Sequence, residues 1–295
     1  MRARSTAAAL ALLIAFAVHS PAGAATRSAT ATAAKVIRTL NAERRANGIP
    51  AGIRDVAAWN QDCKRHDTYM ARSHTLTHDE SPANPWYTAG GTWAGQNSVL
   101  EYGTTWANRD PYEFAPIHLA QLLQPRLNKT GAFELSSAGT TWGCTVTIGG
   151  FKRADPKTNR VYTYPGNGRR GVNYVYVANE LPKTPNQALG IPARTGQQLF
   201  VFASGPILGA NPYAVDITKA SLHPAGGSNV HVRIADALLP FLGIHLGNYL
   251  GPGAGIVIPV KPLRPSTRYV ASVTMKANGM SVSRTWSFTT KKKSS

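Results

Sequence analysis

The segment 77–97, THDESPANPWYTAGGTWAGQN, combines residue types that carry chemistry with residues that form turns. It places His78 beside two acids and closes on Ala-Gly-Gln-Asn. An imidazole beside carboxylates can bind a transition metal or move a proton. The Ser-Pro, Asn-Pro and Gly-Gly pairs are equally typical of a long loop without chemistry of its own. The segment alone therefore leaves three interpretations open: a catalytic centre, a metal site and a turn-rich connection.

The motifs of the common hydrolases and nucleotide-binding proteins are missing from the sequence. It has no Gly-x-Ser-x-Gly elbow, no His-Glu-x-x-His pair and no phosphate-cradling loop. A second histidine, His66, lies on the apolar stripe of a predicted helix, and we interpret it as a hydrogen-bonded core residue. Any chemistry must therefore come from residues that the fold brings together.

Residues 26–150 are predicted to form an α+β domain. One helix starts at Ala31 and stops at Asn47-Gly48. A second follows Asp55, and further helical segments are expected around Trp106 and from about Pro116 to Pro125. The β-branched and aromatic run TTWGCTVTI at 140–148 predicts a strand.

The remainder of the chain is predicted to be all-β. Residues 151–195 are rich in proline and glycine and are interpreted as a connector, with an edge strand at 174–177. Residues 196–295 contain short β-favouring runs, and apolar and polar residues alternate from Met280 to Phe288. Tyr269 follows Leu263 and Pro265 in the manner of the tyrosine corner of immunoglobulin-type sandwiches. We therefore expect a β-sandwich of about 100 residues.

The N-terminus has the three parts of a secretion signal. Arg2 and Arg4 precede an apolar run from Ala7 to Val18, and Ala22-Gly23-Ala24 forms a small-residue cleavage site. We assign residues 1–25 to this signal and expect a secreted protein without an integral membrane segment after its removal.

Two cysteines, Cys63 and Cys144, remain after the signal. An exported chain meets oxidants, so a disulfide between them is one interpretation. It would close a loop of about 80 residues and stabilise the fold by roughly 4 to 5 kcal/mol. Two separate buried thiols are the other interpretation, and the sequence does not choose between them.

Positive charge is concentrated after residue 150. Residues 26–150 carry 12 basic and 10 acidic side chains, a net of +2. Residues 151–195 carry 8 and 2, a net of +6, and residues 196–295 carry 10 and 2, a net of +8. Surfaces this basic attract anionic polymers, so an anionic cell-wall polymer or lipid headgroups are the expected partners.

Several segments together resemble the CAP superfamily, which comprises cysteine-rich secretory proteins, antigen 5 and pathogenesis-related 1, in its bacterial secreted form. The resemblance covers residues 31 to about 150 and rests on the order of its motifs. These motifs are LNAERRANG at 40–48, WNQDCKRHDTYMA at 59–71, THDE at 77–80, WAGQN at 93–97, PIHLAQLLQPRLNKTG at 116–131 and TTWGCTV at 140–146. The resemblance implies an α-β-α sandwich, followed here by an immunoglobulin-like module.

The resemblance also implies a cleft lined by two histidines and two acids. Matching motifs place His78 and His118 at the histidine positions and Gln96 at one acid position, where the family has glutamate. Glu101 and Glu113 compete for the other acid position, and Glu113 is favoured because it shortly precedes His118. Asn97 and Trp93 of the WAGQN motif are expected beside the cleft.

Two functions are expected from these residues. The first is a non-enzymatic binding or interaction protein of the cell envelope, with a lipid or another apolar ligand. The second is a metal-assisted hydrolase of a cell-wall, peptide or nucleic-acid substrate that uses the His78/His118 cleft. Two imidazoles suit zinc, but glutamine at position 96 removes a negative charge, so metal binding is expected to be weak and a catalytic role is disfavoured.

Overall fold

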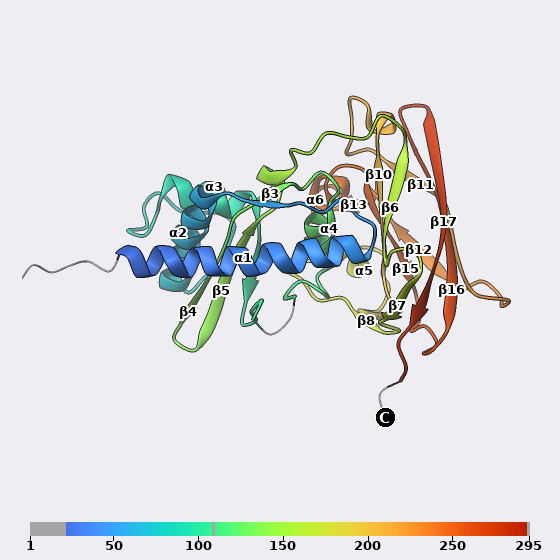
Figure 1. Cartoon of the computed structure of the whole chain (residues 1–295), viewed down its shortest axis with the longest axis horizontal. Coiled ribbons are helices and arrows are strands. Elements are labelled where there is room, and N and C mark those ends of the chain that lie inside the picture. Colours follow the sequence, from blue (N-terminus) through green and yellow to red (C-terminus); the bar gives the residue numbers. More distant parts are fainter. Residues whose placement is uncertain (1–21, 108–109, 294–295) are drawn as a thin grey trace, which may run out of the picture.

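The computed structural model describes residues 22–107 and 110–293. Most of the predicted secretion signal lies outside this range, and residues 22–25 begin helix α1 (Ala22–Ala46). The fold mixes helices and strands: helices surround a small sheet at one end, and two larger sheets form the other end (Figure 1). Within the described residues, no helix is both long and apolar enough to cross a membrane.

The remaining helices are short except for the second. They are α2 (Ala57–Ser73), α3 (Ala89–Gln96), α4 (Pro116–Leu123), α5 (Pro185–Ala188) and α6 (Gly247–Leu250), with single 3-10 turns η1 (Ile148–Gly150) and η2 (Pro206–Leu208). The prediction of a helix around Trp106 is wrong, because this segment forms turns. The Trp106 backbone N–H donates to Glu134 Oε1 at 2.7 Å, and Pro111 disfavours a helical conformation at the preceding residue.

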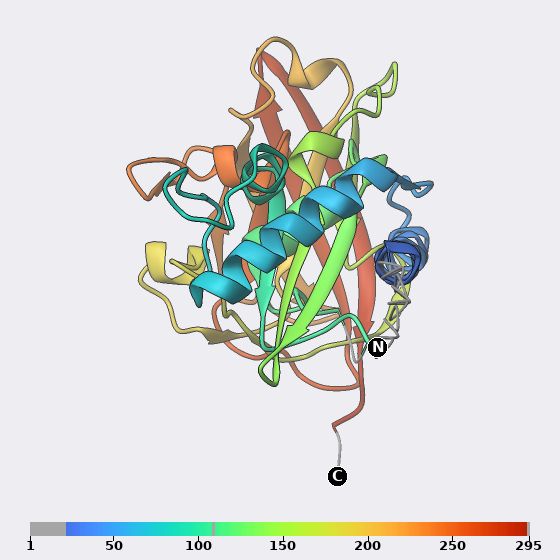
Figure 2. The same ribbon diagram turned by 90° about the vertical axis from the view of Figure 1, so that its left-hand side faces the viewer.

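A three-stranded antiparallel sheet forms the centre of the N-terminal part. Its strand order is β2-β5-β4, with β2 (Ser98–Tyr102), β5 (Thr140–Val146) and β4 (Ala132–Ser137). Side chains alternate between its faces, so Leu100 packs with Cys63 and Met70 of α2, whereas Val99 packs with Val36 and Leu40 of α1. Figure 2 shows α2 crossing one face of this sheet and α1 end-on. The sheet is therefore covered by helices on both faces.

Two four-stranded sheets pack face to face in the C-terminal part, and Leu199, Val257, Val273 and Trp286 belong to their shared core. The first has the order β12-β15-β10-β6 and the second β11-β16-β17-β7. Their strands are β6 (Arg160–Tyr164), β7 (Arg169–Val172), β10 (Leu199–Ser204), β11 (Asp216–Pro224), β12 (Val232–Ala235), β15 (Ala254–Pro259), β16 (Arg268–Ala277) and β17 (Met280–Thr290). Three two-stranded pairs complete the structure: β1 (Arg54–Asp55) with β3 (Lys129–Thr130), β8 (Tyr176–Val177) with β9 (Arg194–Thr195), and β13 (Pro240–Phe241) with β14 (Ile244–His245).

The expectation of a connector at 151–195 is wrong in one respect. Strand β6 pairs with β10 in one sheet, and β7 pairs with β17 in the other. The proline and glycine residues between them form turns, which is why the segment resembles a linker in sequence. The expected contact of Tyr269 is present, since its hydroxyl accepts the Arg264 backbone N–H at 2.8 Å.

Helix α4 lies between the two parts of the chain. Ile117, Leu119, Ala120 and Leu123 pack with residues of β10 and β15, while Leu122 belongs to the core around α1. Apolar residues all around a helix indicate burial on every side, and seven of the eight residues of α4 are buried. The two parts therefore share a hydrophobic core through α4.

The buried Arg44 of α1 secures the C-terminal end of α4. Its guanidinium donates to the Leu122 and Gln124 carbonyl oxygens at 2.8 and 2.9 Å. Burial, and then the neighbouring Arg153, lower its pKa to about 9. The carbonyl groups at the end of a helix stabilise the cation that burial disfavours.

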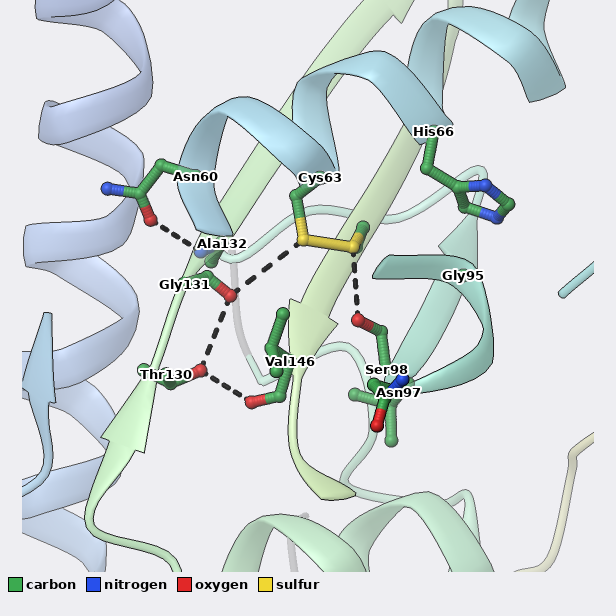
Figure 3. Close-up of a disulfide and its surroundings, with 12 residues drawn as sticks. Asn60, Cys63, His66, Gly95, Asn97, Ser98, Thr130, Gly131, Ala132 and Val146 are labelled. Carbon is green, nitrogen blue, oxygen red and sulfur yellow. Dashed lines mark hydrogen bonds between the residues drawn. A yellow bond between two sulfur atoms is a disulfide. The ribbon is translucent and has the colours of Figure 1, made fainter. Parts of the chain in front are cut away.

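Cys63 and Cys144 form a disulfide that joins α2 to the central strand β5, with 5.3 Å between their Cα atoms (Figure 3). The Ser98 hydroxyl lies 3.2 Å from Cys144 Sγ and is the donor, because a disulfide sulfur carries no hydrogen. Both cysteines are buried in the core between α2 and the sheet. The structure thus selects the disulfide from the two interpretations of the sequence.

We expect the double variant Cys63→Ala with Cys144→Ala to lower the free energy of unfolding by about 4 kcal/mol, because the bridge closes a loop of 81 residues. Urea unfolding of wild type and variant under oxidising conditions measures this loss. Reduced wild type should approach the stability of the variant. A loss below about 1 kcal/mol would show that the unfolded chain gains little freedom without the bridge.

Candidate functional site

A cavity of about 600 Å³ lies at the edge strand β2, between the N-terminal and C-terminal parts. Four segments line it: the end of the loop after α2, strand β2, the turns leading into α4, and the chain before α5. The lining residues are Leu76, Thr77, His78, Leu100, Glu101, Tyr102, Thr104, Pro111, Tyr112, Ala115, His118, Asn179, Glu180, Leu181 and Pro182. Both histidines assigned from the sequence therefore line one cavity.

The His78 ring is fixed through one nitrogen. Its Nδ1 lies 2.7 Å from the Gly95 carbonyl oxygen, which only accepts, so Nδ1 carries the hydrogen and Nε2 presents a lone pair. Burial lowers the pKa of His78; the bond to Gly95 opposes this shift and nearby His118 adds to it. His78 is therefore neutral at pH 7 and can act as a hydrogen-bond acceptor or a metal ligand.

The His118 ring is fixed by a carboxylate. Its Nδ1 lies 2.9 Å from Glu180 Oε2, and the Tyr112 ring stacks on it with 5.7 Å between centroids. The Glu180 carboxylate also accepts the Ile117 backbone N–H at 2.9 Å, at the N-terminus of α4. The side chain of Glu180 is 1% exposed, against 17% for His118. One buried acid thus caps the helix and orients the imidazole.

Sequence reasoning missed Glu180. It lies far along the chain from His118, within the presumed connector, where no local motif marks it. One available signal was its negative charge, because Glu180 and Asp155 are the only acidic residues among residues 151–195. Both contact the N-terminal part, since Asp155 pairs with Arg126. Isolated acids in a basic segment are good candidates for specific partners.

Glu101 takes the position for which Glu113 was favoured. Glu101 lines the cavity and is 4% exposed. Its carboxyl lies over Gly143, where an added Cβ would collide with Oε1, and neither of its oxygens has a hydrogen-bond partner within the described residues. Glu134 lies across Gly143 on the far edge strand. Burial first, and then Glu134, raise the pKa of Glu101 to about 11, so a neutral acid lines the cavity at pH 7.

Asp67 of α2 extends this group of acids. It is fully buried, and neither of its carboxyl oxygens has a hydrogen-bond partner within the described residues. Burial, and then Glu134, raise its pKa well above the ordinary value. Burial therefore favours the neutral form of the Asp67 carboxyl as well.

The assignment of Glu113 to the cleft is wrong. Its Oε1 accepts a hydrogen bond from Asn173 Nδ2 at 2.8 Å, and it lines a separate cavity of about 230 Å³ with Glu43, Asp110 and Arg169. Proximity to His118 in sequence is misleading here. The turn that precedes α4 directs Glu113 toward β7 and away from the histidines.

The residues of the WAGQN motif support the site from outside. Gln96 is the exposed last residue of α3, and its Nε2 donates to Asp79 Oδ1 at 3.0 Å, so its expected position in the cleft is wrong. Asn97 caps α3 through Trp93 O at 2.9 Å. Trp93 packs on Trp59 with 5.3 Å between ring centroids. Neither residue lines the cavity.

The two histidines expected to bind a metal, His78 and His118, both line the cavity. Across residues 22–107 and 110–293, no group of three or more histidine, cysteine or acidic side chains is arranged to hold a metal ion. The expected core histidine is confirmed: His66 is buried, with Nδ1 2.9 Å from Glu80 Oε1 and Nε2 2.8 Å from Thr77 O.

Comparison with known proteins assigns no family to the chain. No family model and no curated protein matches it. A solved structure of PcoC, a methionine-rich copper resistance protein from Escherichia coli, aligns with 44% of this chain and 93% of its own at 14% identity and a TM-score of 0.25. A similarity this low supports no inference about fold or function.

We expect Glu180→Ala to lower the free energy of unfolding by about 2 kcal/mol, because it removes a helix cap and leaves a buried N–H without a partner. Urea unfolding at pH 7 measures the change. Glu113→Ala is the matched control, since it removes one hydrogen bond from a half-buried acid, and it should cost about half as much. Equal losses would mean that Glu180 stabilises the fold no more than a single hydrogen bond of a half-buried acid does.

We expect Glu101→Gln to change how stability depends on pH. Folded Glu101 keeps a proton that the unfolded chain releases above pH 4.5, so the stability of the wild type falls as the pH rises from 5 toward 11. This residue contributes at most about 1.4 kcal/mol per pH unit. Urea unfolding at pH 6, 8 and 9.5 should show a shallower decline in Glu101→Gln but not in Glu113→Gln. Parallel curves for wild type and Glu101→Gln would contradict the raised pKa of Glu101.

Proposed function

We propose that the chain is a secreted, CAP-type binding protein of the cell envelope that takes a small amphiphilic molecule into the His78/His118 cavity. Two independent observations support the proposal. The motifs THDE, WAGQN and PIHLAQLLQPRLNKTG occur in the order that the CAP superfamily uses. Two of these motifs supply His78 and His118, which line one cavity of about 600 Å³, within the range of small-molecule sites.

The observation that carries the proposal is the apolar rim of the cavity. Leu76, Tyr102 and Leu181 line it and are 40%, 55% and 74% exposed. Single exposed apolar side chains are normal, but three around one cavity form a surface that gains from being covered. An alkyl chain or a fused apolar ring would cover them.

The polar groups define the other end of the ligand. The Nε2 atoms of His78 and His118 can accept hydrogen bonds, because Nδ1 is engaged in both rings. Protonated Glu101 can donate one. A hydroxyl or carbonyl group on an apolar body satisfies these groups without bringing a charge into the cavity. A long-chain alcohol or ester is therefore the ligand class that we propose.

Residues 151–293 supply the contact with the envelope in this proposal. Lys291, Lys292 and Lys293 are exposed at the end of the described chain. Together with the net positive charge of this part, they favour anionic wall polymers or lipid headgroups as partners, with an affinity that falls as salt is added.

A hydrolase is the second candidate, and the His118–Glu180 pair favours it. A carboxylate that orients an imidazole through Nδ1 leaves Nε2 able to take a proton from water. Hydrolysis of p-nitrophenyl butyrate that disappears in His118→Ala, with or without added zinc, would support an enzyme over a binding protein.

We expect wild-type protein to bind the uncharged ester methyl cis-parinarate, with displacement by 1-hexadecanol. Leu76→Ser combined with Leu181→Ser should weaken binding about tenfold, because two apolar contacts of the rim are lost. Fluorescence titration measures both affinities.

Leu238→Ser combined with Ile244→Ser is the matched control. These residues are 45% and 50% exposed but do not line the cavity, so affinity should stay unchanged. Equal weakening in both double variants would show that the probe binds to exposed apolar surface in general.

A further inference from the structure

A second groove, of about 320 Å³, lies between helix α2 and the loop 85–88. Two successive turns of α2 form one wall and the loop forms the other. The lining residues are Gln61, Lys64, Arg65, Thr68, Pro85, Trp86, Tyr87 and Thr88. None of them lines the cavity that holds His78 and His118. The groove is therefore a separate site.

Two neighbouring aromatic side chains of the groove face solvent. Trp86 is 43% exposed and Tyr87 is 36% exposed. The Arg72 guanidinium lies 5.0 Å from the centroid of the Trp86 ring, which orients the indole by a cation–π contact. Flat apolar rings with a polar edge, held at the surface, suit a partner that is itself flat and amphipathic.

The loop that carries these rings is fixed in place. The buried Glu80 carboxylate contacts His66 Nδ1 at 2.9 Å and accepts the Thr88 backbone N–H at 2.8 Å. Asn84 Nδ2 donates to Ser73 Oγ at 3.0 Å, and its Oδ1 accepts the Trp86 backbone N–H at 2.9 Å. Both ends of the loop are thus attached to α2 or to the buried, hydrogen-bonded side chains of Glu80 and His66. A ligand would not have to order the loop on binding.

Cations surround the aromatic pair. Lys64 and Arg65 line the groove, and Arg72 lies against Trp86. Asp62 is the acid nearby, and it pairs with Arg65 at 2.6 Å. Lys64 forms no ion pair with any residue in the described part of the chain. The groove therefore offers positive charge beside a stacking surface.

We propose that this groove binds an anionic polysaccharide, with a sugar ring on Trp86 and Tyr87 and its acidic substituents at Lys64 and Arg65. A neutral glycan would leave the cations unused, and an acidic peptide would leave the rings uncovered. Single-stranded nucleic acid offers both a ring and a charge. The polysaccharide is favoured because the secretion that we propose for the protein, on which this step rests, and the disulfide both suit an oxidising, extracellular setting.

The test uses the full chain and three probes: hexagalacturonate, neutral cellohexaose and a dT12 oligonucleotide. Calorimetry from 20 to 300 mM salt should show binding of hexagalacturonate. Trp86→Ala should weaken it about tenfold or more at every salt concentration, whereas Trp86→Phe should retain most of the affinity. Lys64→Gln combined with Arg65→Gln should weaken binding at low salt and flatten its dependence on salt.

Two control variants separate this groove from general surface properties. Tyr213→Ala removes an aromatic side chain that is 39% exposed in the C-terminal part, and Arg45→Gln removes an exposed charge from α1, away from the groove. Neither should alter hexagalacturonate binding. Displacement of methyl cis-parinarate by 1-hexadecanol should be the same in Trp86→Ala as in wild type, so failure here is distinguishable from failure of the proposed cavity ligand.

Three results would overturn the proposal. Equal affinity for cellohexaose would remove the role of charge. Tighter binding of dT12 than of hexagalacturonate would assign the groove to single-stranded nucleic acid. Unchanged affinity in Trp86→Ala, with an unchanged melting temperature, would exclude the groove as the binding site.

Discussion

The carboxylate of Glu180 makes the two parts of the chain depend on each other. It comes from the C-terminal part, yet it caps α4 and holds the ring of His118. A buried carboxylate is stable only when its oxygens are satisfied, and the N-terminus of a helix supplies N–H donors and a favourable dipole. The cavity is therefore assembled only when both parts are folded together.

Helix α4 extends this dependence into the hydrophobic core. Its apolar residues reach both the N-terminal sheet and the outer face of the strands β10 and β15, which are buried on both sides. Arg44 and Glu180 secure its two ends through charged hydrogen bonds. A helix of eight residues is too short to be stable alone, so these contacts determine its position, and with it the position of His118.

Much of the fold could be predicted from the sequence, because periodic patterns report burial directly. The stripe through Cys63, His66 and Met70 placed α2 on its sheet, and the alternation from Met280 to Phe288 placed β17. Turn-rich sequence was less informative, since the strands β6 and β7 lie between prolines and glycines that also suit a linker. Pairing with a distant strand, which sequence pattern does not show, decides whether such residues form a sheet.

The candidate site could be predicted only in part, for a related reason. Motif order located His78 and His118, whose backbone positions depend on nearby helices. The acidic residues of the site were harder to predict. Glu113 precedes His118 by five residues but contacts Asn173 instead. Glu180 contacts the His118 ring from the other part of the chain. Side-chain direction and long-range packing, not separation in sequence, select which carboxyls meet an imidazole.

The shared position of α4 also bears on the order in which the chain can fold. A chain made from its N-terminus presents α4 long before residue 180 exists to cap it, and before β10 and β15 can cover its apolar face. The N-terminal part then exposes the apolar residues of α4 that later pack on β10 and β15, a surface that favours aggregation until it is covered. Helix α4 therefore reaches its final packing only after strand β15 has been made.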